Sequence, residues 1–198
     1  MNSWTDRLEA LLARQRRVIL GIAGSPGAGK TAMAGLIASS VDGAVHVPMD
    51  GFHLADAELR RLGRLDRKGA IDTFDADGYL TLLQRIRSQT VEIVYAPAFD
   101  REIEQPVAGS IPVEPTARLI VTEGNYLLDD ANPWPDVRSV LDEVWFVDCE
   151  PAERRRRLIA RHIEFGKSPD HARAWVRDVD EPDAERIERV RHKADLVI

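Results

Sequence analysis

Eight residues near the start of the chain constrain its fold more than any other stretch. Residues 24–31 read GSPGAGKT and lie between the apolar run VILGIA and a helical run at Lys30–Ser40. The three glycines of this stretch let the backbone come close to a bound group, and the N-terminus of the following helix attracts negative charge. A buried strand, a glycine-rich turn and a helix in this order predict a βα unit whose turn binds an anion.

The same stretch matches G-x-x-x-x-G-K-[ST], the P-loop, which predicts binding of a nucleoside triphosphate. The Lys30 side chain would reach the β- and γ-phosphates, and the Thr31 hydroxyl would bind Mg²⁺. A turn that only connects strand and helix is the alternative, and the motif and its context together argue against it. The predicted cofactor-binding residues are Gly24, Ser25, Pro26, Gly27, Ala28, Gly29, Lys30 and Thr31.

Short apolar runs recur along the chain, and helical runs separate them. The apolar runs are VILGIA, AVHVPM, VEIVYA, ARLIVTE, EVWFVD and ADLVI, and several are nearly continuous in Val, Ile and Leu. Such runs are typical of strands that are buried on both faces of a parallel sheet. We therefore expect one α/β domain over residues 1–198, with the three-layer α/β/α P-loop nucleoside triphosphate hydrolase fold and a mainly parallel sheet.

Helical periodicity is clear at residues 76–88, 151–165 and 169–179, and we expect a helical lid at about 151–180. The proline-bearing segment at residues 96–115 is predicted to be a long irregular loop, and loops of that length are usually functional.

Composition and charge argue against several classes of protein. The net charge of −6 argues against nucleic-acid binding, and the ordinary balance of 44% hydrophobic and 30% charged residues argues against a disordered or fibrous protein. No apolar run approaches the roughly 20 residues that span a bilayer, so no membrane partner is expected. A single cysteine, Cys149, cannot form an intrachain disulfide, and we therefore expect a reducing, cytoplasmic environment.

Two carboxylates close apolar runs, at the edge of a parallel sheet where functional groups gather. Asp50 follows AVHVPM, and Glu123 ends ARLIVTE. Asp50 could take the proton of an attacking hydroxyl or hold a magnesium-bound water, and the sequence leaves both roles open. Glu123 could lie near Mg²⁺ or bond substrate hydroxyls. The alternatives are a turn cap for Asp50 and an exposed loop residue for Glu123.

The densest positive run is ERRRRLIARH at Glu153–His162, which contains five arginines. Arg157 and Arg161 are four residues apart and share one helix face. Arginines that close over a transferring phosphoryl group would stabilise its charge, which makes these two, with Lys30 and Asp50, the predicted catalytic residues. A solvated helix face is the alternative, and the lack of interleaved aromatic residues argues against nucleic-acid binding here.

Taken in order, several motifs resemble the P-loop kinases that include uridine kinase, phosphoribulokinase and bacterial pantothenate kinase. The motifs are GSPGAGKT, MDGFH at 49–53, RKGAIDTFDADGY at 67–79, YAPAFDR at 95–101, TEGNYLL at 122–128 and RRRRLIARHIEFG at 154–166. Within that superfamily the chain is most similar to a bacterial subgroup labelled nucleoside or fructose-transport-system kinases. The resemblance covers nearly the whole chain.

The resemblance implies ATP and Mg²⁺ as cofactors and phosphoryl transfer to an alcohol oxygen of a small metabolite, such as fructose, a nucleoside or a pantothenate-like acceptor. It implies Asp50 as the base and Thr31, Glu123 and Asp50 near the metal. The implied acceptor-binding residues are His53, Arg67, Lys68, Tyr95, Asp100, Arg101, Glu123 and Tyr126. Relatives often carry an asparagine where Asp183 stands, and a carboxylate cannot donate the hydrogen bonds of an amide.

Two other functions stay open at this point. The first is an ATP-binding regulatory or interaction protein without kinase turnover, for which the segment at 96–115 would be the docking surface. The second is an ATPase that releases phosphate to water. A guanine-reading N-K-x-D motif and the L-S-G-G-Q signature are both absent, which argues against a GTPase and a transport ATPase. Many relatives associate as dimers or higher oligomers, and no interface patch is evident in the sequence, so a homodimer is also open.

Overall fold

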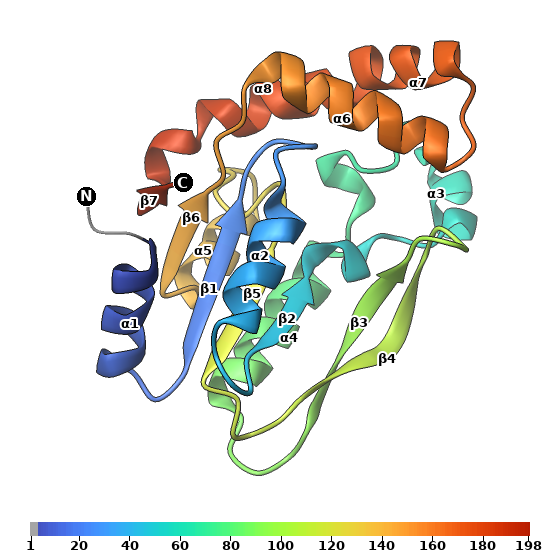
Figure 1. Cartoon of the computed structure of the whole chain (residues 1–198). Coiled ribbons are helices and arrows are strands. Elements are labelled where there is room, and N and C mark those ends of the chain that lie inside the picture. The colour runs from blue at the N-terminus through green and yellow to red at the C-terminus, as the bar shows by residue number, and fades with distance from the viewer. Residues whose placement is uncertain (1–3) are drawn as a thin grey trace.

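The computed structural model describes residues 4–198, so the first three residues of the predicted domain lie outside the described part (Figure 1). Its main sheet has the strand order β2-β5-β1-β6-β7, and every neighbouring pair is parallel. The strands are β1 (Val18–Ala23), β2 (Val45–Pro48), β5 (Leu119–Glu123), β6 (Glu143–Phe146) and β7 (Leu196–Val197). All residues of β1 and β5 are buried, as expected of central parallel strands.

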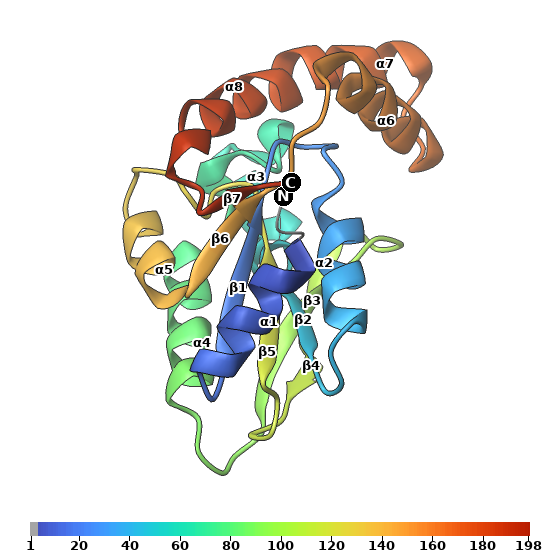
Figure 2. The same ribbon diagram turned by 60° about the vertical axis from the view of Figure 1, so that its left-hand side comes forward.

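Helices cover both faces of this sheet. Alternate residues of β1 point to opposite faces, so Ile19 joins one hydrophobic core and Leu20 joins the other. The first core includes residues of α4 (Ala76–Ser88) and α5 (Trp134–Val140). The second includes residues of α1 (Trp4–Arg14) and α2 (Lys30–Ser39). Figure 2 shows α4 and α5 on one side of the sheet and α2 on the other. The predicted three-layer fold is confirmed.

Three helices lie across the carboxyl ends of the parallel strands: α6 (Pro151–Glu164), α7 (Pro169–Trp175) and α8 (Glu181–Arg189) (Figure 1). Glu150 caps α6 by accepting from the first backbone N–H groups, and Ser168 caps α7 in the same way. A π-helical turn at Val176–Asp180 joins α7 to α8. Within residues 4–198 no helix is long and apolar enough to cross a membrane.

The segment predicted as an irregular loop is instead a β-hairpin, which corrects the prediction for 96–115. Strands β3 (Val94–Asp100) and β4 (Gln105–Val113) pair antiparallel in a sheet of their own. The run VEIVYA, expected in the parallel sheet, therefore contributes only its end, to β3. Prolines suggested a loop, but Pro97 lies at a register shift, and β4 pairs on one edge only. Prolines are tolerated at bulges and on edge strands.

Candidate functional site

The P-loop lies directly under α6, and its glycines are required by space and by conformation. Gly27 has φ 80°, and a Cβ atom on it would lie 2.8 Å from Leu158 Cγ and 2.9 Å from the Arg154 carbonyl oxygen. Gly29 has φ 105° and precedes the first residue of α2 without a side-chain cap. The first N–H groups of α2 are therefore not bonded by a capping side chain, which suits an anion.

The predicted lysine, threonine and carboxylates meet at this edge of the sheet. Lys30 is buried, and its Nζ donates to the Ser25 carbonyl oxygen over 3.2 Å. Burial lowers the pKa of Lys30, whereas the charges of Glu123 and Asp50 raise it. Thr31 Oγ1 donates to Glu123 Oε1 over 2.8 Å. Burial and the neighbouring charge of Asp50 raise the pKa of Glu123.

The donor atoms at this edge suit a magnesium ion. Mg²⁺ prefers oxygen ligands and is usually bound through one or two protein carboxylates together with substrate phosphates and water. Thr31 and Glu123 supply a hydroxyl and a carboxylate side by side beneath the P-loop, and the charge of Asp50 acts on Glu123. Among residues 4–198 no group of three or more His, Cys, Asp and Glu side chains could hold a metal ion.

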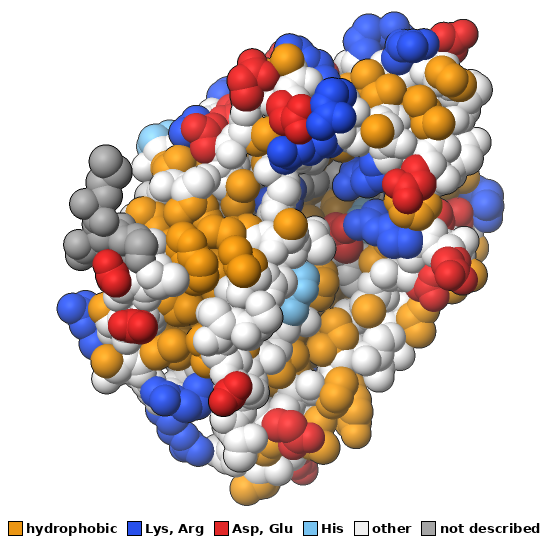
Figure 3. All heavy atoms as spheres, viewed as in Figure 1, with side chains coloured by type: hydrophobic (Ala, Val, Ile, Leu, Met, Phe, Trp, Pro, Cys, Tyr) orange, Lys and Arg blue, Asp and Glu red, His pale blue; other side chains and the backbone are white. Residues whose placement is uncertain are grey.

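A cleft of about 790 Å³ runs from the P-loop to the turn between α6 and α7. In Figure 3, Lys and Arg side chains gather around the hollow beneath α6. The predicted residues that line this cleft are Pro26, Gly27, Gly29, Lys30, Thr31, Asp50, His53, Lys68, Arg101, Glu123, Arg157 and Arg161. The fold thus brings residues predicted to bind the nucleotide and residues predicted to bind the acceptor into the same cavity.

Asp50 lies in the short turn Met49–Phe52 that follows β2, and the hairpin holds its side chain. Arg101 Nη2 donates to Asp50 Oδ2 over 2.8 Å. The Arg101 guanidinium also lies over the Phe99 ring, 5.1 Å from its centroid. This stacking fixes the direction of the guanidinium, so the Asp50 carboxylate is held in a defined orientation at the cleft.

His53 offers a hydrogen-bond acceptor to the cleft. Its Nδ1 lies 2.8 Å from the Asp50 carbonyl oxygen, which can only accept, so Nδ1 carries the proton and Nε2 a lone pair. The ring packs between Phe74 and Phe99, with centroid distances of 4.1 and 4.9 Å. Burial lowers the pKa of His53, which keeps the imidazole neutral.

Comparison with known proteins identifies the family. No family model matches the chain. It is 36% identical over 171 residues to a candidate uridine kinase of Schizosaccharomyces pombe, covering 81% of this chain and 73% of the relative. It is 38% identical over 133 residues to the ATP-dependent kinase-like protein notR' of Aspergillus versicolor, covering 64% and 77%. The chain belongs to the uridine-kinase-like P-loop kinases.

A solved structure shares the whole fold of this uridine-kinase-like chain. The crystal structure of a candidate fructose transport system kinase from Silicibacter sp. TM1040 superposes with a TM-score of 0.89 at 33% identity, and both chains are covered completely. P-loop kinases use ATP. The resemblance expected from the motifs is therefore confirmed at the level of the family and the fold.

Of the five arginines on and near α6, two line the cleft of this kinase fold. Arg157 lies over the P-loop, because its Nη1 would be 3.7 Å from a Cβ atom on Gly29. Arg161 lines the cleft and acts on the charge of Lys30, and no carboxylate within residues 4–198 pairs with it. Arg156 lies on the exposed side and pairs with Glu153 over 2.7 Å, and the same carboxylate accepts from Arg157 Nε over 2.8 Å. The shared face predicted for Arg157 and Arg161 is the face that meets the cleft.

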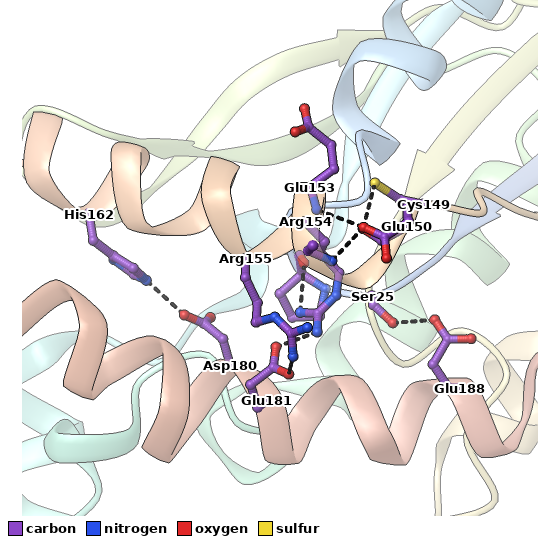
Figure 4. A network of polar contacts seen from close by, with 12 residues as sticks. Ser25, Cys149, Glu150, Glu153, Arg154, Arg155, His162, Asp180, Glu181 and Glu188 are labelled. Atoms are coloured by element: carbon purple, nitrogen blue, oxygen red, sulfur yellow. Dashed lines mark hydrogen bonds and ion pairs between the residues drawn. The ribbon is translucent and has the colours of Figure 1, made fainter.

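A polar network ties α8 to the P-loop and to α6 (Figure 4). The P-loop hydroxyl of Ser25 donates to Glu188 Oε1 over 2.7 Å. Buried Arg154 donates to the Pro26 carbonyl oxygen over 3.4 Å and pairs with Glu181 of α8. Sequence reasoning missed both glutamates because Ser25 and Glu188 are 163 residues apart, and no local pattern marks such a pair.

Two predicted acceptor residues on the hairpin lie outside the cleft lining, which corrects their expected position. Tyr95 is 57% exposed and lies opposite Pro112 in the ribbon, while the neighbouring positions Val94 and Ala96 are buried. The period of two along a strand therefore turns the Tyr95 side chain outward. The Asp100 carboxylate accepts from the Glu102 backbone N–H over 2.8 Å, so it caps the hairpin turn.

Two further predicted acceptor residues support the cleft wall from behind. Arg67 pairs with Asp72 within its own loop over 2.8 Å and does not line the cleft. Tyr126 is buried, and its hydroxyl donates to the Gly69 carbonyl oxygen over 2.7 Å. Gly69 itself lines the cleft. Neither side chain reaches the cavity: Arg67 binds the Asp72 carboxylate, and Tyr126 binds the backbone of Gly69.

Other residues that were not predicted also line the cleft. Lys167 Nζ lies 4.6 Å from the centroid of the Trp175 ring at the end of α7. Trp175 is an aromatic residue in an otherwise polar helix, and this pattern could have indicated that α7 lines a cavity. The unpredicted lining residues include Asp56, Phe99, Glu104, Asn125, Lys167, His171 and Trp175.

Proposed function

We propose that the protein is an ATP-dependent kinase that transfers the γ-phosphoryl group to an alcohol oxygen of a small metabolite. The observation that carries this proposal is a single cleft that joins the P-loop lysine, the Asp50 carboxylate and the two arginines of α6. A phosphate cradle, a proton acceptor and mobile cations are the parts that in-line phosphoryl transfer requires.

The nucleotide end would bind the phosphates of ATP through the P-loop backbone, the N-terminus of α2 and Lys30. Thr31 and Glu123 would hold Mg²⁺. Bound MgATP supplies the activated γ-phosphoryl group and neutralises part of its charge. Arg157 and Arg161 would stabilise the charge that gathers on the transferring group and exclude water from above.

The acceptor end would orient the attacking hydroxyl. Asp50 would accept its proton, and the Arg101 guanidinium holds the carboxylate in place for that step. His53 Nε2 would accept a hydrogen bond from a second hydroxyl of the acceptor. These groups suit a molecule rich in hydroxyls, and the names of the relatives add uridine and fructose to the acceptors worth testing.

The regulatory alternative relied on the segment at 96–115 as a docking surface. That segment is the hairpin, and three of its residues, Phe99, Arg101 and Glu104, line the cleft. Because the hairpin forms one wall of the cleft where the acceptor would bind, its position favours a kinase over an ATP-binding interaction protein.

The first experiment measures ADP release from MgATP in the presence of fructose and other sugars, nucleosides, pantothenate and glycerate. Wild type is compared with Lys30→Met, which lacks the phosphate-binding charge. We expect one acceptor class to stimulate ADP release by wild type and none to stimulate the variant. Tight ATP binding without stimulation by any acceptor would favour the regulatory alternative, and equal turnover without acceptor would indicate an ATPase.

Removing the cleft arginine is expected to slow transfer strongly. Arg161→Gln lowers kcat by about 10²–10³-fold, because a preorganised cation at the transferring group is lost. Arg156→Gln on the same helix is the matched control, and it changes kcat by less than about twofold, since an exposed ion pair contributes little. Steady-state kinetics with the stimulating acceptor checks both values. Equal losses in the two variants would mean that α6 matters only for stability.

A further inference from the structure

Lys68 carries a positive charge in the wall of the cleft, and its hydrogen bonds are already satisfied there. Its Nζ donates to Asp56 Oδ1 over 2.6 Å and to the Glu104 backbone carbonyl oxygen. The ammonium also lies over the Phe99 ring, 5.3 Å from the ring centroid. The Lys68 side chain is only 13% exposed, and all four residues line the cleft. An ammonium has three N–H donors, so these contacts leave little of it for an incoming anion.

The carboxylate that pairs with Lys68 is fixed by its own backbone. Asp56 is the first residue of α3 (Asp56–Leu62), and its N–H donates to Gln105 Oε1 at the start of β4 over 3.1 Å. Its second oxygen lies 3.7 Å from the exposed Arg60 guanidinium. Burial raises the pKa of Asp56, whereas the bonds and charges around it, chiefly those of Lys68, lower it by more. The carboxyl is therefore ionised, and the pair with Lys68 is neutral.

The Phe99 ring places this ion pair at the acceptor end. The Arg101 guanidinium lies over the same ring, 5.1 Å from its centroid, and the His53 ring packs against it at 4.9 Å. Arg101 is itself paired with Asp50, the proposed base. The ion pair of Lys68 therefore lies one aromatic ring away from the group that would accept the proton of the acceptor.

The charges of this wall favour an acceptor without negative charge. Lys68 and Arg101 are each balanced by one carboxylate, and Glu104 on the hairpin adds another, which has no cationic partner within residues 4–198. The remaining cation, Lys167 on the turn between α6 and α7, lies over the Trp175 ring. A carboxylate or phosphate on the acceptor would meet like charge here without an unpaired cation to offset it, and like charges in contact weaken binding.

Uncharged polar groups face the same space. His53 Nε2 offers a lone pair, as its Nδ1 proton is bound to the Asp50 carbonyl oxygen. The Asn125 side chain lines the cleft, and its amide has no hydrogen-bond partner in the part of the chain that the structure describes. An amide donates through nitrogen and accepts through oxygen, and a hydroxyl does both. These groups therefore match the hydroxyls of an uncharged acceptor.

We propose that Asp56 is a specificity-determining residue, which holds Lys68 in a closed ion pair and thereby restricts the acceptor to uncharged molecules. The proposal rests on the proposed function only in taking this end of the cleft as the acceptor site. It divides the acceptors worth testing, because sugars and nucleosides carry no charge, whereas pantothenate and glycerate each carry a carboxylate. Asp56 acts through Lys68, by occupying the cation that an anionic acceptor would need.

Matched molecules that differ in charge test the proposal by binding alone. Glycerate is compared with glycerol, gluconate with sorbitol, and pantothenate with panthenol. Isothermal titration is carried out on the whole chain with a non-hydrolysable MgATP analogue bound. We expect wild type to bind each uncharged molecule at least as tightly as its anionic partner. Tighter binding of the anions by wild type would overturn the proposal.

Asp56→Asn is the variant that decides it. The amide keeps the shape of the side chain but leaves the Lys68 ammonium without a counter-ion. We expect the anions to gain affinity by about tenfold or more, the usual effect of one hydrogen bond to a charged group, and the uncharged molecules to change by less than about twofold. Glycerate should also raise the Tm of this variant more than glycerol does. If the anions gain no affinity, the proposal is overturned, and Asp56→Ser repeats the test should the amide fail to fold.

Two further variants separate the ion pair from the net charge of the wall. Glu104→Gln removes a carboxylate from the same wall without releasing a cation, so anion affinity should rise by less than about threefold. The double variant Asp56→Asn/Lys68→Met should lose the gain of Asp56→Asn, because the released ammonium is gone. An equal gain in Glu104→Gln, or a gain that survives in the double variant, would overturn the role of the ion pair.

Turnover gives a separate reading of the same specificity. We expect Asp56→Asn to lower the KM of the anionic molecules by about tenfold relative to their uncharged partners, with kcat changing by less than about threefold. An unchanged ratio of the KM values would contradict the proposal. If no acceptor stimulates ADP release by any variant, the proposed function fails, and the binding comparison alone decides this proposal.

Discussion

Asp50→Asn is expected to lower kcat for phosphoryl transfer by about 10²–10⁴-fold, the usual contribution of a positioned general base. The amide keeps the shape of the carboxylate but cannot accept the proton of the attacking hydroxyl. It also loses the ion pair with Arg101, which joins Nη2 and Oδ2 over 2.8 Å. ATP affinity should stay within about threefold, because in the proposed function the P-loop and α2 would supply most phosphate contacts.

Single-turnover kinetics and direct ATP titration together check this expectation. Asp100→Asn is the matched control, since this carboxylate lies on the same hairpin as Arg101 but caps a turn outside the cleft. Its kcat should remain near that of wild type. If ATP affinity falls as much as kcat, Asp50 binds a magnesium-bound water and does not act as the base. A fully active Asp50→Asn variant would exclude both roles.

Gly27→Ala is expected to distort the P-loop and to weaken ATP binding. The new Cβ would lie 2.8 Å from Leu158 Cγ and 2.9 Å from the Arg154 carbonyl oxygen, and the latter is backbone that cannot rotate away. Overpacking of this kind costs about 1–3 kcal/mol of folding stability. The positive φ of 80° adds about 1–2 kcal/mol for a residue with a Cβ.

The loop has to move away from α6 to relieve this contact, and its N–H groups then no longer converge on the phosphates. We therefore expect ATP affinity to fall by about 10²-fold or more, which corresponds to the loss of roughly two well-placed bonds to a charged ligand. Isothermal titration with ATP and thermal unfolding check the two effects. Gly35→Ala in α2 is the control, because nothing lies within 4 Å of its added Cβ. It should stabilise the protein by about 0.5–1 kcal/mol. Normal ATP binding by Gly27→Ala would contradict the geometry of the loop.

Local chemistry was sufficient to predict the parts of the fold that repeat a simple rule. The run VILGIA became the buried central strand β1, and GSPGAGKT became the turn into α2, because a continuous apolar run and a glycine-rich turn each permit few structures. Asp50 and Glu123 were predicted to meet because the carboxyl ends of parallel strands share one edge. Their charges do act on each other.

The hairpin was predicted to be an irregular loop, and the error has a physical reason. Prolines mark loops in most contexts, but an isolated two-stranded ribbon has free edges and bulges where Pro97 breaks no required pairing. Once the ribbon forms, Tyr95 is exposed between the buried residues Val94 and Ala96. Phe99 has the same parity as Tyr95 but lies beyond the register shift at Ala96/Ala98, and it lines the cavity together with Arg101, which follows the end of β3.

The sequence by itself determined the phosphate-binding turn, the parallel sheet, the two carboxylates at its edge and the helix face of Arg157 and Arg161. These features depend on residues that are close in the chain, where spacing fixes direction. Only the tertiary structure decided that Ser25 bonds Glu188 and that Arg154 is buried. Such pairs join segments far apart in the chain, and both the bonding and the protonation of a side chain depend on the charge and burial that those distant segments bring to it.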